Sequence, residues 1–297
     1  MLLEVKDLNI SLTSGKSVAE HISFRLGQGE MLSIVGSSGA GKTTICKAIM
    51  GLLGNAYRAD GEILFQAENL LNLPERKRQA IYGKEICLIM QNPMTAFNPS
   101  IRVGRQLEKT YLLHHGKMPK QEMQRLFAGI LQRLGLEDTQ RILNSYPFTL
   151  SGGMLQRLMI AAALMCQPSL LVADEATTAI DACNRIGLMR ELKSFCKDGM
   201  SVLFVTHDLR SASVSDRILV MDRGQIVEQG KTEQILNTPK EDYTKYLLNA
   251  CRLERREMSC SRSLASSMMQ SFSRSGRLLY KSRGNKGVSF LNSSPSQ

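Results

Sequence analysis

The fold is decided by one glycine-rich stretch, which reads Gly36-Ser37-Ser38-Gly39-Ala40-Gly41-Lys42-Thr43. Its glycines let the backbone wrap tightly, so that several N–H groups can point inward at phosphate oxygens. An apolar run from Met31 to Val35 precedes the stretch, and a helix pattern from Lys42 to Leu53 follows it. The helix adds its positive N-terminal end to the same anion site. The stretch therefore predicts a loop for nucleotide phosphates, with Lys42 on the β- and γ-phosphates and the Thr43 hydroxyl on Mg²⁺.

Apolar runs on both sides of this unit predict a sheet. Leu170 to Ala173 and Val202 to Val205 are continuous apolar segments, which is typical of a parallel sheet covered on both faces. Gly15, Gly27 and Gly29 punctuate short alternating segments near the N-terminus. Further strands are expected at Leu2–Val5, Asn9–Leu12, Ile22–Leu26, Gly61–Phe65 and Ile86–Met90, with a closing hairpin formed by Arg217–Met221 and Gln225–Glu228.

The pattern changes to helical periods between about residues 92 and 160, after Pro93 and Pro99 break the chain. We therefore expect an α/β domain over residues 1–250 with a helical insert. Residues 251–297 are rich in Ser and Arg and poor in large apolar periods, which predicts a basic, disordered tail.

Composition argues against three classes of protein. Of the net charge of +11, +7 falls within residues 252–297, so the body is only mildly basic and no nucleic-acid partner is expected. No apolar run reaches the roughly 18 to 20 residues that span a bilayer. Seven scattered cysteines form no C-x-x-C pair, which argues against a zinc site or a disulfide framework.

Two carboxylates end one of the buried runs. Asp174 and Glu175 follow Leu170 to Ala173, where a strand end brings acids to water and a ligand. Asp174 suits a Mg²⁺ shell, because hard cations prefer carboxylate oxygen, and Glu175 is then placed to polarise an attacking water. Gln91 and His207 each follow another apolar run. Taken alone, His207 is better interpreted as a structural histidine, and Gln91 is uninformative.

The segment Leu150-Ser151-Gly152-Gly153-Met154-Leu155-Gln156-Arg157 resembles the signature of the ATP-binding-cassette (ABC) family. The resemblance covers about residues 1–250. Family members carry, in order, a phosphate loop, a glutamine loop, the signature, an acidic strand end, a short Asp-containing loop and a switch histidine. These match Gly36–Thr43, Gln91, Ser151–Gln156, Asp174–Glu175, Asp181 and His207. The resemblance implies a P-loop NTPase core with a parallel sheet, an N-terminal antiparallel β subdomain and an inserted helical subdomain.

The resemblance also implies an ATPase with ATP and Mg²⁺ at its site. Glu175, His207 and Gln91 would be catalytic, and Thr43, Gln91 and Asp174 would hold the metal. The nucleotide contacts would extend beyond the phosphate loop to Thr44, Ser151, Gly152, Gly153, Gln156 and Asp181. The serine and glycines before a helix form a second anion site, which a head-to-tail partner, a homologue or a second copy, would offer to the nucleotide.

The implied setting is a transporter. The chain would lie peripherally on the cytoplasmic face of the plasma (inner) membrane, bound to permease subunits and served by an extracytoplasmic substrate-binding protein. Met90 to Pro99 and Ser145 to Phe148 resemble the oligopeptide/nickel importers. Phe148 and Leu155 stand where peptide importers usually have His and Arg, and Cys251 and Cys260 do not reproduce their Cys-rich motif. This favours a nickel or metal-chelate importer, with a dipeptide or oligopeptide importer as the alternative.

Two departures from the family and one rival class stay open. Ala176 replaces the proline that usually follows the glutamate. The aromatic that normally stacks on adenine is missing near residues 10–13, where only Leu12 offers an apolar platform, so base selectivity stays open. A soluble, non-transport ABC ATPase is the remote alternative. Such relatives usually carry two cassettes or a long coiled-coil insert, whereas this chain has one cassette and a short insert.

Overall fold

The phosphate loop follows the third strand of a six-stranded sheet in the computed structural model, which describes residues 1–176 and 182–251. The strand order is β10-β9-β3-β8-β7-β6, with β10 antiparallel to β9 and the other neighbours parallel. The strands are β3 (Met31–Gly36), β6 (Ile86–Ile89), β7 (Leu170–Asp174), β8 (Ser201–Thr206), β9 (Arg217–Asp222) and β10 (Gln225–Lys231). The parallel sheet and the closing hairpin predicted from the sequence are confirmed.

Both faces of this sheet are covered, as the continuous apolar runs predicted. Val202 and Phe204 of β8 pack into a cluster with α6 and α7, whereas Leu203 and Val205 pack with α1 and the N-terminal strands. Such alternation is the period of two expected of a strand. The covering helices include α1 (Lys42–Ile49), α7 (Ala182–Lys197), α8 (Leu209–Ala212) and α9 (Thr232–Asn237). A further helix, α2 (Glu75–Ile81), has no buried residue and precedes β6 in the chain.

A second, four-stranded antiparallel sheet is formed mainly by the N-terminal residues, in the order β2-β1-β4-β5. Its strands are β1 (Leu3–Leu12), β2 (Ser17–Leu26), β4 (Tyr57–Phe65) and β5 (Glu68–Asn69). The two strands predicted before residue 13 are one strand. The buried positions change phase after Val5, and a register irregularity with a left-handed Asp7 (φ 43°) restores the inward face at Leu8.

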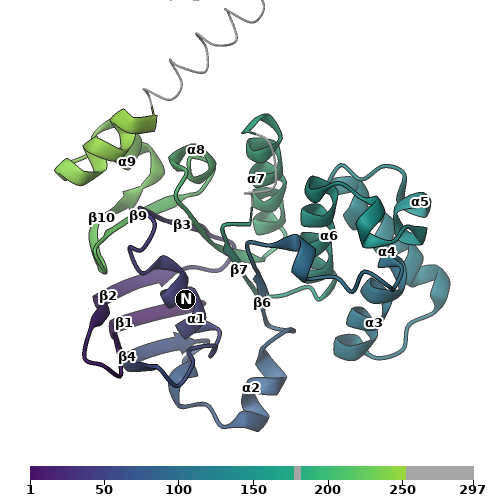
Figure 1. Ribbon diagram of the computed structural model, residues 1–297, viewed down its shortest axis with the longest axis horizontal. Helices are drawn as coiled ribbons and strands as arrows, with labels where there is room; N and C mark the ends of the chain where they lie inside the picture. The colour runs from purple at the N-terminus through teal and green to yellow at the C-terminus, as the bar shows by residue number, and fades with distance from the viewer. Residues whose placement is uncertain (177–181, 252–297) are drawn as a thin grey trace, which may run out of the picture. The chain divides into compact units, whose positions relative to one another are not determined.

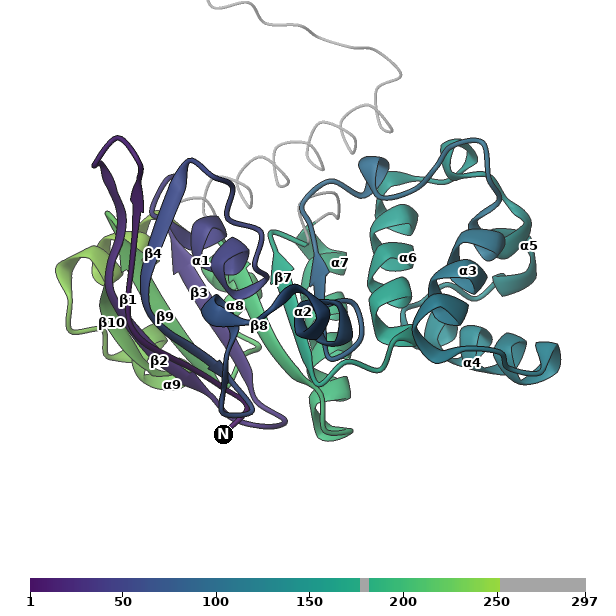
Figure 2. The same cartoon turned by 90° about the horizontal axis from the view of Figure 1, so that it is seen from below.

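The helical insert lies between β6 and β7 and is drawn beside the sheet in Figures 1 and 2. Leu107, Phe127 and Leu158 from three of its helices share one core cluster with Leu171 of the sheet, so α6 ties the insert to the core. The insert comprises α3 (Val103–His115), α4 (Lys120–Arg133), α5 (Thr139–Asn144) and α6 (Gly152–Met165). Short 3₁₀ turns are η1 (Leu70–Asn72), η2 (Pro93–Thr95) and η3 (Pro147–Thr149).

The helix after the phosphate loop is shorter than predicted. It ends at Ile49 rather than Leu53, because Gly51 takes a left-handed conformation (φ 64°) and stops it. Residues 1–251 form one compact unit. Apart from residue 251, the predicted tail lies outside the described residues. Within residues 1–176 and 182–251, no helix combines the length and apolar character needed to cross a bilayer.

Candidate nucleotide site

The sheet register gathers the predicted site residues at one edge. Gly36 pairs with Met221, and Asp174 pairs with Val205, so β3, β7, β8 and β9 end at similar heights. Because the carboxyl ends of parallel strands face the same way, the residues that follow them meet there. Gln91, Glu175 and His207, which come from three different strands, are brought together in this way.

The phosphate loop has the tight backbone that its glycines predicted. Gly41 has φ 94° and directly precedes α1. Lys42 is buried, and its Nζ donates to the carbonyl oxygens of Gly36 at 2.8 Å and Ser37 at 2.7 Å. In the first turn of α1, the N–H groups of Thr44 and Ile45 both donate to the carbonyl oxygen of Gly41 at 3.1 Å. A helix N-terminus in general leaves its first N–H groups without intrahelical acceptors, which makes it an anion site.

Gly36 has no room for a side chain. A Cβ atom there would lie 2.2 Å from the carbonyl oxygen of Met221. We expect Gly36→Ala to destabilise the fold by about 1–3 kcal/mol, the usual cost of overpacking, and to lower the melting temperature by several degrees in a thermal unfolding scan. Gly54→Ala is the matched control, since a Cβ at Gly54 meets nothing within 4 Å. Equal melting temperatures for the two variants would contradict the close approach of the Gly36 backbone to the carbonyl oxygen of Met221.

The charges around Lys42 are arranged for an anion. Burial lowers the pKa of Lys42, and the negative charges of Glu175 and Asp174 oppose that shift. Burial raises the pKa of Asp174, while the hydrogen bond from Thr43 acts the other way. Lys42 is thus a buried ammonium beside two carboxylates. A phosphate would compensate the charge of Lys42, and a cation would compensate the charges of Asp174 and Glu175.

Thr43 and Asp174 fit a magnesium ion. The Thr43 hydroxyl donates to Asp174 Oδ1 at 3.2 Å, which places two hard oxygen donors side by side. Gln91, the third predicted metal ligand, donates through Nε2 to Glu175 Oε2 at 2.8 Å, so its amide oxygen is not involved in that bond.

Glu175 is held by the other two predicted catalytic residues. Gln91 bonds one carboxylate oxygen, and Nδ1 of His207 lies 3.1 Å from the other. The Glu175 backbone is left-handed (φ 48°), an uncommon conformation for this residue type, and its N–H donates to Val205 at 2.9 Å. Backbone strain of this kind concentrates at functional sites, where surrounding contacts enforce it.

The signature residues lie on a different element. Ser151 caps α6 and its Oγ accepts from the Met154 N–H at 3.3 Å, while Gly152 and Gly153 open the helix. Figures 1 and 2 both draw α6 on the insert side and α1 on the opposite side of the sheet. Gln156 is fully buried, so the structure does not bring its side chain to the exposed end where Ser151 lies. Asp181 falls outside the described residues.

Two contacts to the phosphate loop had no signal in the sequence. The N–H of Gly224, in the β9–β10 turn, donates to Ala40 at 3.2 Å. The Tyr243 hydroxyl accepts from the Ser37 N–H at 3.1 Å. The Arg223-Gly224 turn was predicted, but its long-range contact depends on tertiary packing.

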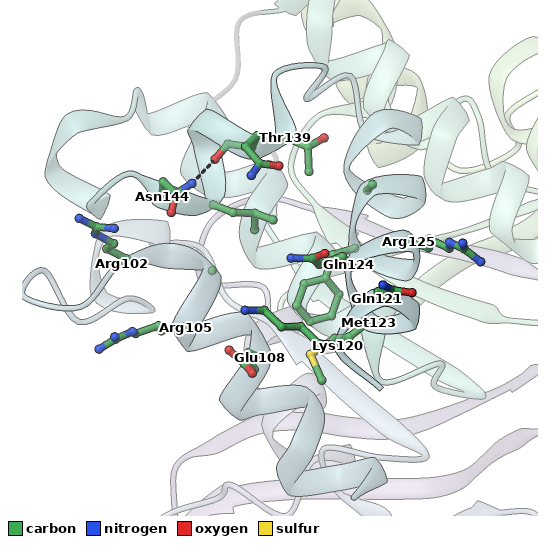
Figure 3. A pocket seen from close by; sticks show the side chains of 15 residues that line it. Arg102, Arg105, Glu108, Lys120, Gln121, Met123, Gln124, Arg125, Thr139 and Asn144 are labelled. Atoms are coloured by element: carbon green, nitrogen blue, oxygen red, sulfur yellow. Dashed lines mark hydrogen bonds between the residues drawn. The ribbon is translucent and has the colours of Figure 1, made fainter. Parts of the chain in front are cut away.

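The helical insert holds a cavity of about 840 Å³ that is not this site. It lies among α3, α4 and α5, and none of the residues that line it belongs to the nucleotide motifs. Figure 3 shows its mostly polar lining, which includes Arg102, Arg105, Glu108, Lys120 and Gln124.

Strand, glycine loop, helix and acidic strand end on a parallel sheet define a P-loop ATPase with an inserted helical subdomain. A family model described as "ABC transporter" matches residues 19–178. The chain belongs to the ABC transporter family, as an ATP-hydrolysing enzyme coupled to transport.

Individual relatives agree with this assignment. The chain is 40% identical to the metal-staphylopine import system ATP-binding protein CntD of Staphylococcus aureus, over 84% of this chain and 92% of that protein. It is 42% identical to the oligopeptide transport ATP-binding protein OppD of Bacillus subtilis, over 83% of this chain and 71% of that protein. A dimeric ATP-binding cassette, MJ0796 bound to ADP and Pi, superimposes with a TM-score of 0.69 at 26% identity, over 78% of this chain and 99% of that one.

Proposed function

We propose that this chain is the ATP-hydrolysing subunit of an ABC importer for nickel or a metal chelate, peripheral on the cytoplasmic face of the plasma (inner) membrane. The observation that carries the enzymatic part is the Glu175 carboxylate, held between Gln91 and His207 beside the phosphate loop. ATP is the substrate, and Mg²⁺ is the proposed cofactor.

The residues of the loop bind and orient the nucleotide. The loop N–H groups from Ser38 to Thr43 and the end of α1 surround the β- and γ-phosphates, and Lys42 Nζ reaches the phosphate oxygens from its place beside the carbonyl oxygens of Gly36 and Ser37. Thr43 and Asp174 would supply oxygen ligands to Mg²⁺, and a bound Mg²⁺ would neutralise charge on the phosphates. Preorganised donors of this kind stabilise a transition state without reorganising.

Glu175 polarises the attacking water. Its carboxylate is fixed by the amide of Gln91 and the ring of His207, so the base points in one direction before the nucleotide arrives. His207 is exposed and lies beside Glu175, where it would sense the γ-phosphate. Loss of the γ-phosphate then changes the contacts of Glu175 and His207. Because Gln91 contacts Glu175 and directly precedes the helical insert, the change would be passed to the insert.

A complete site needs a second subunit. Ser151 and the N-terminus of α6 form an anion site separate from the loop, and the similarity to a dimeric cassette supports a head-to-tail pair. Each nucleotide would lie between the loop of one subunit and Ser151 of the other. The partner subunit is a second copy or a homologous ATPase.

The permease subunits would bind beside Gln91. Large apolar side chains are exposed on both sides of the glutamine loop and before the signature, namely Met90, Met94, Ile101 and Phe148. Tyr146 and Phe148 stack with ring centroids 5.6 Å apart. Exposed apolar side chains of this kind are typical of a protein interface. A membrane partner bound to them would lie next to Gln91, which contacts Glu175. A substrate-binding protein would act on the far side of the permease.

The cargo proposal depends on similarity and on two residues. The metal-chelate relative is covered over 92% of its length, and Phe148 and Leu155 differ from the pattern of peptide importers. A dipeptide or oligopeptide importer is the second candidate, because OppD is 42% identical.

Deleting the gene and measuring uptake separates the two cargoes. We expect lower uptake of radioactive nickel or of a nickel chelate, restored by the wild-type gene but not by the Lys42→Ala variant, with peptide uptake unchanged. Unimpaired metal uptake together with lost peptide uptake would replace the first candidate by the second.

A further inference from the structure

The last helical residues of the described chain, 242–251, contact the phosphate loop. The Tyr243 hydroxyl accepts a hydrogen bond from the backbone N–H of Ser37 at 3.1 Å, across 206 positions of sequence. Together with α9, this helix forms the yellow-green end of the ribbon in Figure 1. Tyr243 therefore connects the C-terminal end of the domain to the loop that begins the nucleotide site.

The helix is fixed at both ends. The carboxylate of Glu228, on β10, accepts from the N–H groups of Lys240 at 2.9 Å and Glu241 at 3.2 Å. At the other end, Arg210 of α8 donates to the carbonyl oxygen of Cys251 at 2.9 Å. A carboxylate near a helix N-terminus and a guanidinium near its C-terminus both complement the helix dipole. The position of Tyr243 is thus set by two other elements of the domain.

The same helix packs on an apolar cluster shared with the site. The cluster includes Val35, which directly precedes the phosphate loop, and Leu209, which follows His207 by two positions. Side chains of the helix that pack against it are Tyr243, Leu247, Leu248 and Cys251. The helix therefore contacts the strand that enters the loop and the helix that follows the switch histidine.

Ser37 is held from both sides. Its N–H is bonded to Tyr243, and its carbonyl oxygen accepts from Lys42 Nζ at 2.7 Å. Two bonds in different directions fix the orientation of the peptide groups that open the loop. A loop that is ordered before the ligand arrives loses less conformational entropy on binding.

We propose that Tyr243 is a positioning residue for the phosphate loop, which raises affinity for ATP by holding Ser37 in its binding conformation. The inference rests on the proposed function, since it takes Gly36–Thr43 to be the ATP site. It assigns a role in nucleotide binding to the terminal helix.

Tyr243→Phe tests the proposal, because phenylalanine keeps the ring packing and removes only the hydroxyl. Tyr246→Phe is the matched control, since Tyr246 lies on the same helix, stacks on Tyr243 at 6.5 Å and is 66% exposed. The full-length chain is titrated with a non-hydrolysable ATP analogue and Mg²⁺ by calorimetry, and steady-state hydrolysis is measured as kcat and KM.

Tyr243→Phe is expected to weaken binding of the analogue about three- to tenfold and to raise KM similarly, because the ATP-free loop is no longer held in its binding conformation and the worth of one neutral hydrogen bond sets the limit. The same variant should change kcat little and lower the melting temperature by a few degrees at most, and Tyr246→Phe should change none of these quantities. A change in affinity below twofold for Tyr243→Phe, or equal losses for both variants, would overturn the positioning role.

Lys42→Ala separates this outcome from a failure of the proposed function. If Lys42→Ala loses binding while Tyr243→Phe does not, only the inference on Tyr243 is wrong. If Lys42→Ala binds the analogue as the wild type does, the loop is not the ATP site and the proposed function fails with it.

Discussion

Replacing Glu175 by glutamine is expected to leave ATP binding within about threefold of the wild type and to lower kcat about 10²- to 10⁴-fold, the usual contribution of a general base. Glutamine has the same length and can keep one of the two bonds that Gln91 and His207 make to the carboxylate. It lacks the negative charge that polarises water. Binding is measured by calorimetry and turnover by phosphate release.

The control for this variant is Glu122→Gln, which removes an exposed carboxylate from α4 in the insert. It should hydrolyse ATP at the wild-type rate. Wild-type turnover in Glu175→Gln would remove the general-base assignment. Loss of ATP binding would indicate instead that Glu175 contributes to binding ATP before hydrolysis.

Lys42→Ala is expected to weaken ATP binding by about 1.5–3 kcal/mol, which is roughly ten- to 150-fold, the range for a hydrogen bond to a charged group. The ammonium is buried in the loop and already faces two carbonyl oxygens, so it needs little rearrangement to reach phosphate oxygens. Titration with ATP and Mg²⁺ measures the loss, and circular dichroism checks that the fold is retained.

Lys109→Ala provides the control, because Lys109 is an exposed lysine on α3 of the helical insert. Its removal should leave affinity nearly unchanged. Equal affinity in Lys42→Ala and the wild type would contradict the role of the phosphate loop.

The sequence predicted most of the elements that carry the site, because each has a strong local signal. The strand, loop and helix around Gly41 combine an apolar run, several glycines and a helical period. Leu170–Asp174 and Ser201–Thr206 are apolar enough to be read as buried strands without further information. The joining of Leu3–Leu12 into one strand was missed, because the irregularity at Asp7 interrupts the alternation.

Contacts that depend on tertiary packing could not be predicted in this way. Nothing near Tyr243 in the sequence indicates that its hydroxyl reaches Ser37, since the contact depends on how the terminal helix is fixed. Gln156 matched the signature motif, but the motif carries no information on which side of α6 faces the core, where Leu155 and Leu158 are also buried. A pattern of apolar residues likewise does not show what Glu175 and Ser151 do. Their proposed roles depend on the chemistry of a carboxylate and a hydroxyl next to ATP.

A structure of the assembled transporter carrying Glu175→Gln, with ATP and Mg²⁺ bound, tests the composite site most directly. Ser151 of one ATPase subunit is expected to lie within hydrogen-bond distance of the γ-phosphate held by the glycine loop of the other. A nucleotide-loaded structure in which Ser151 faces solvent, with no second cassette opposite it, would contradict the composite site.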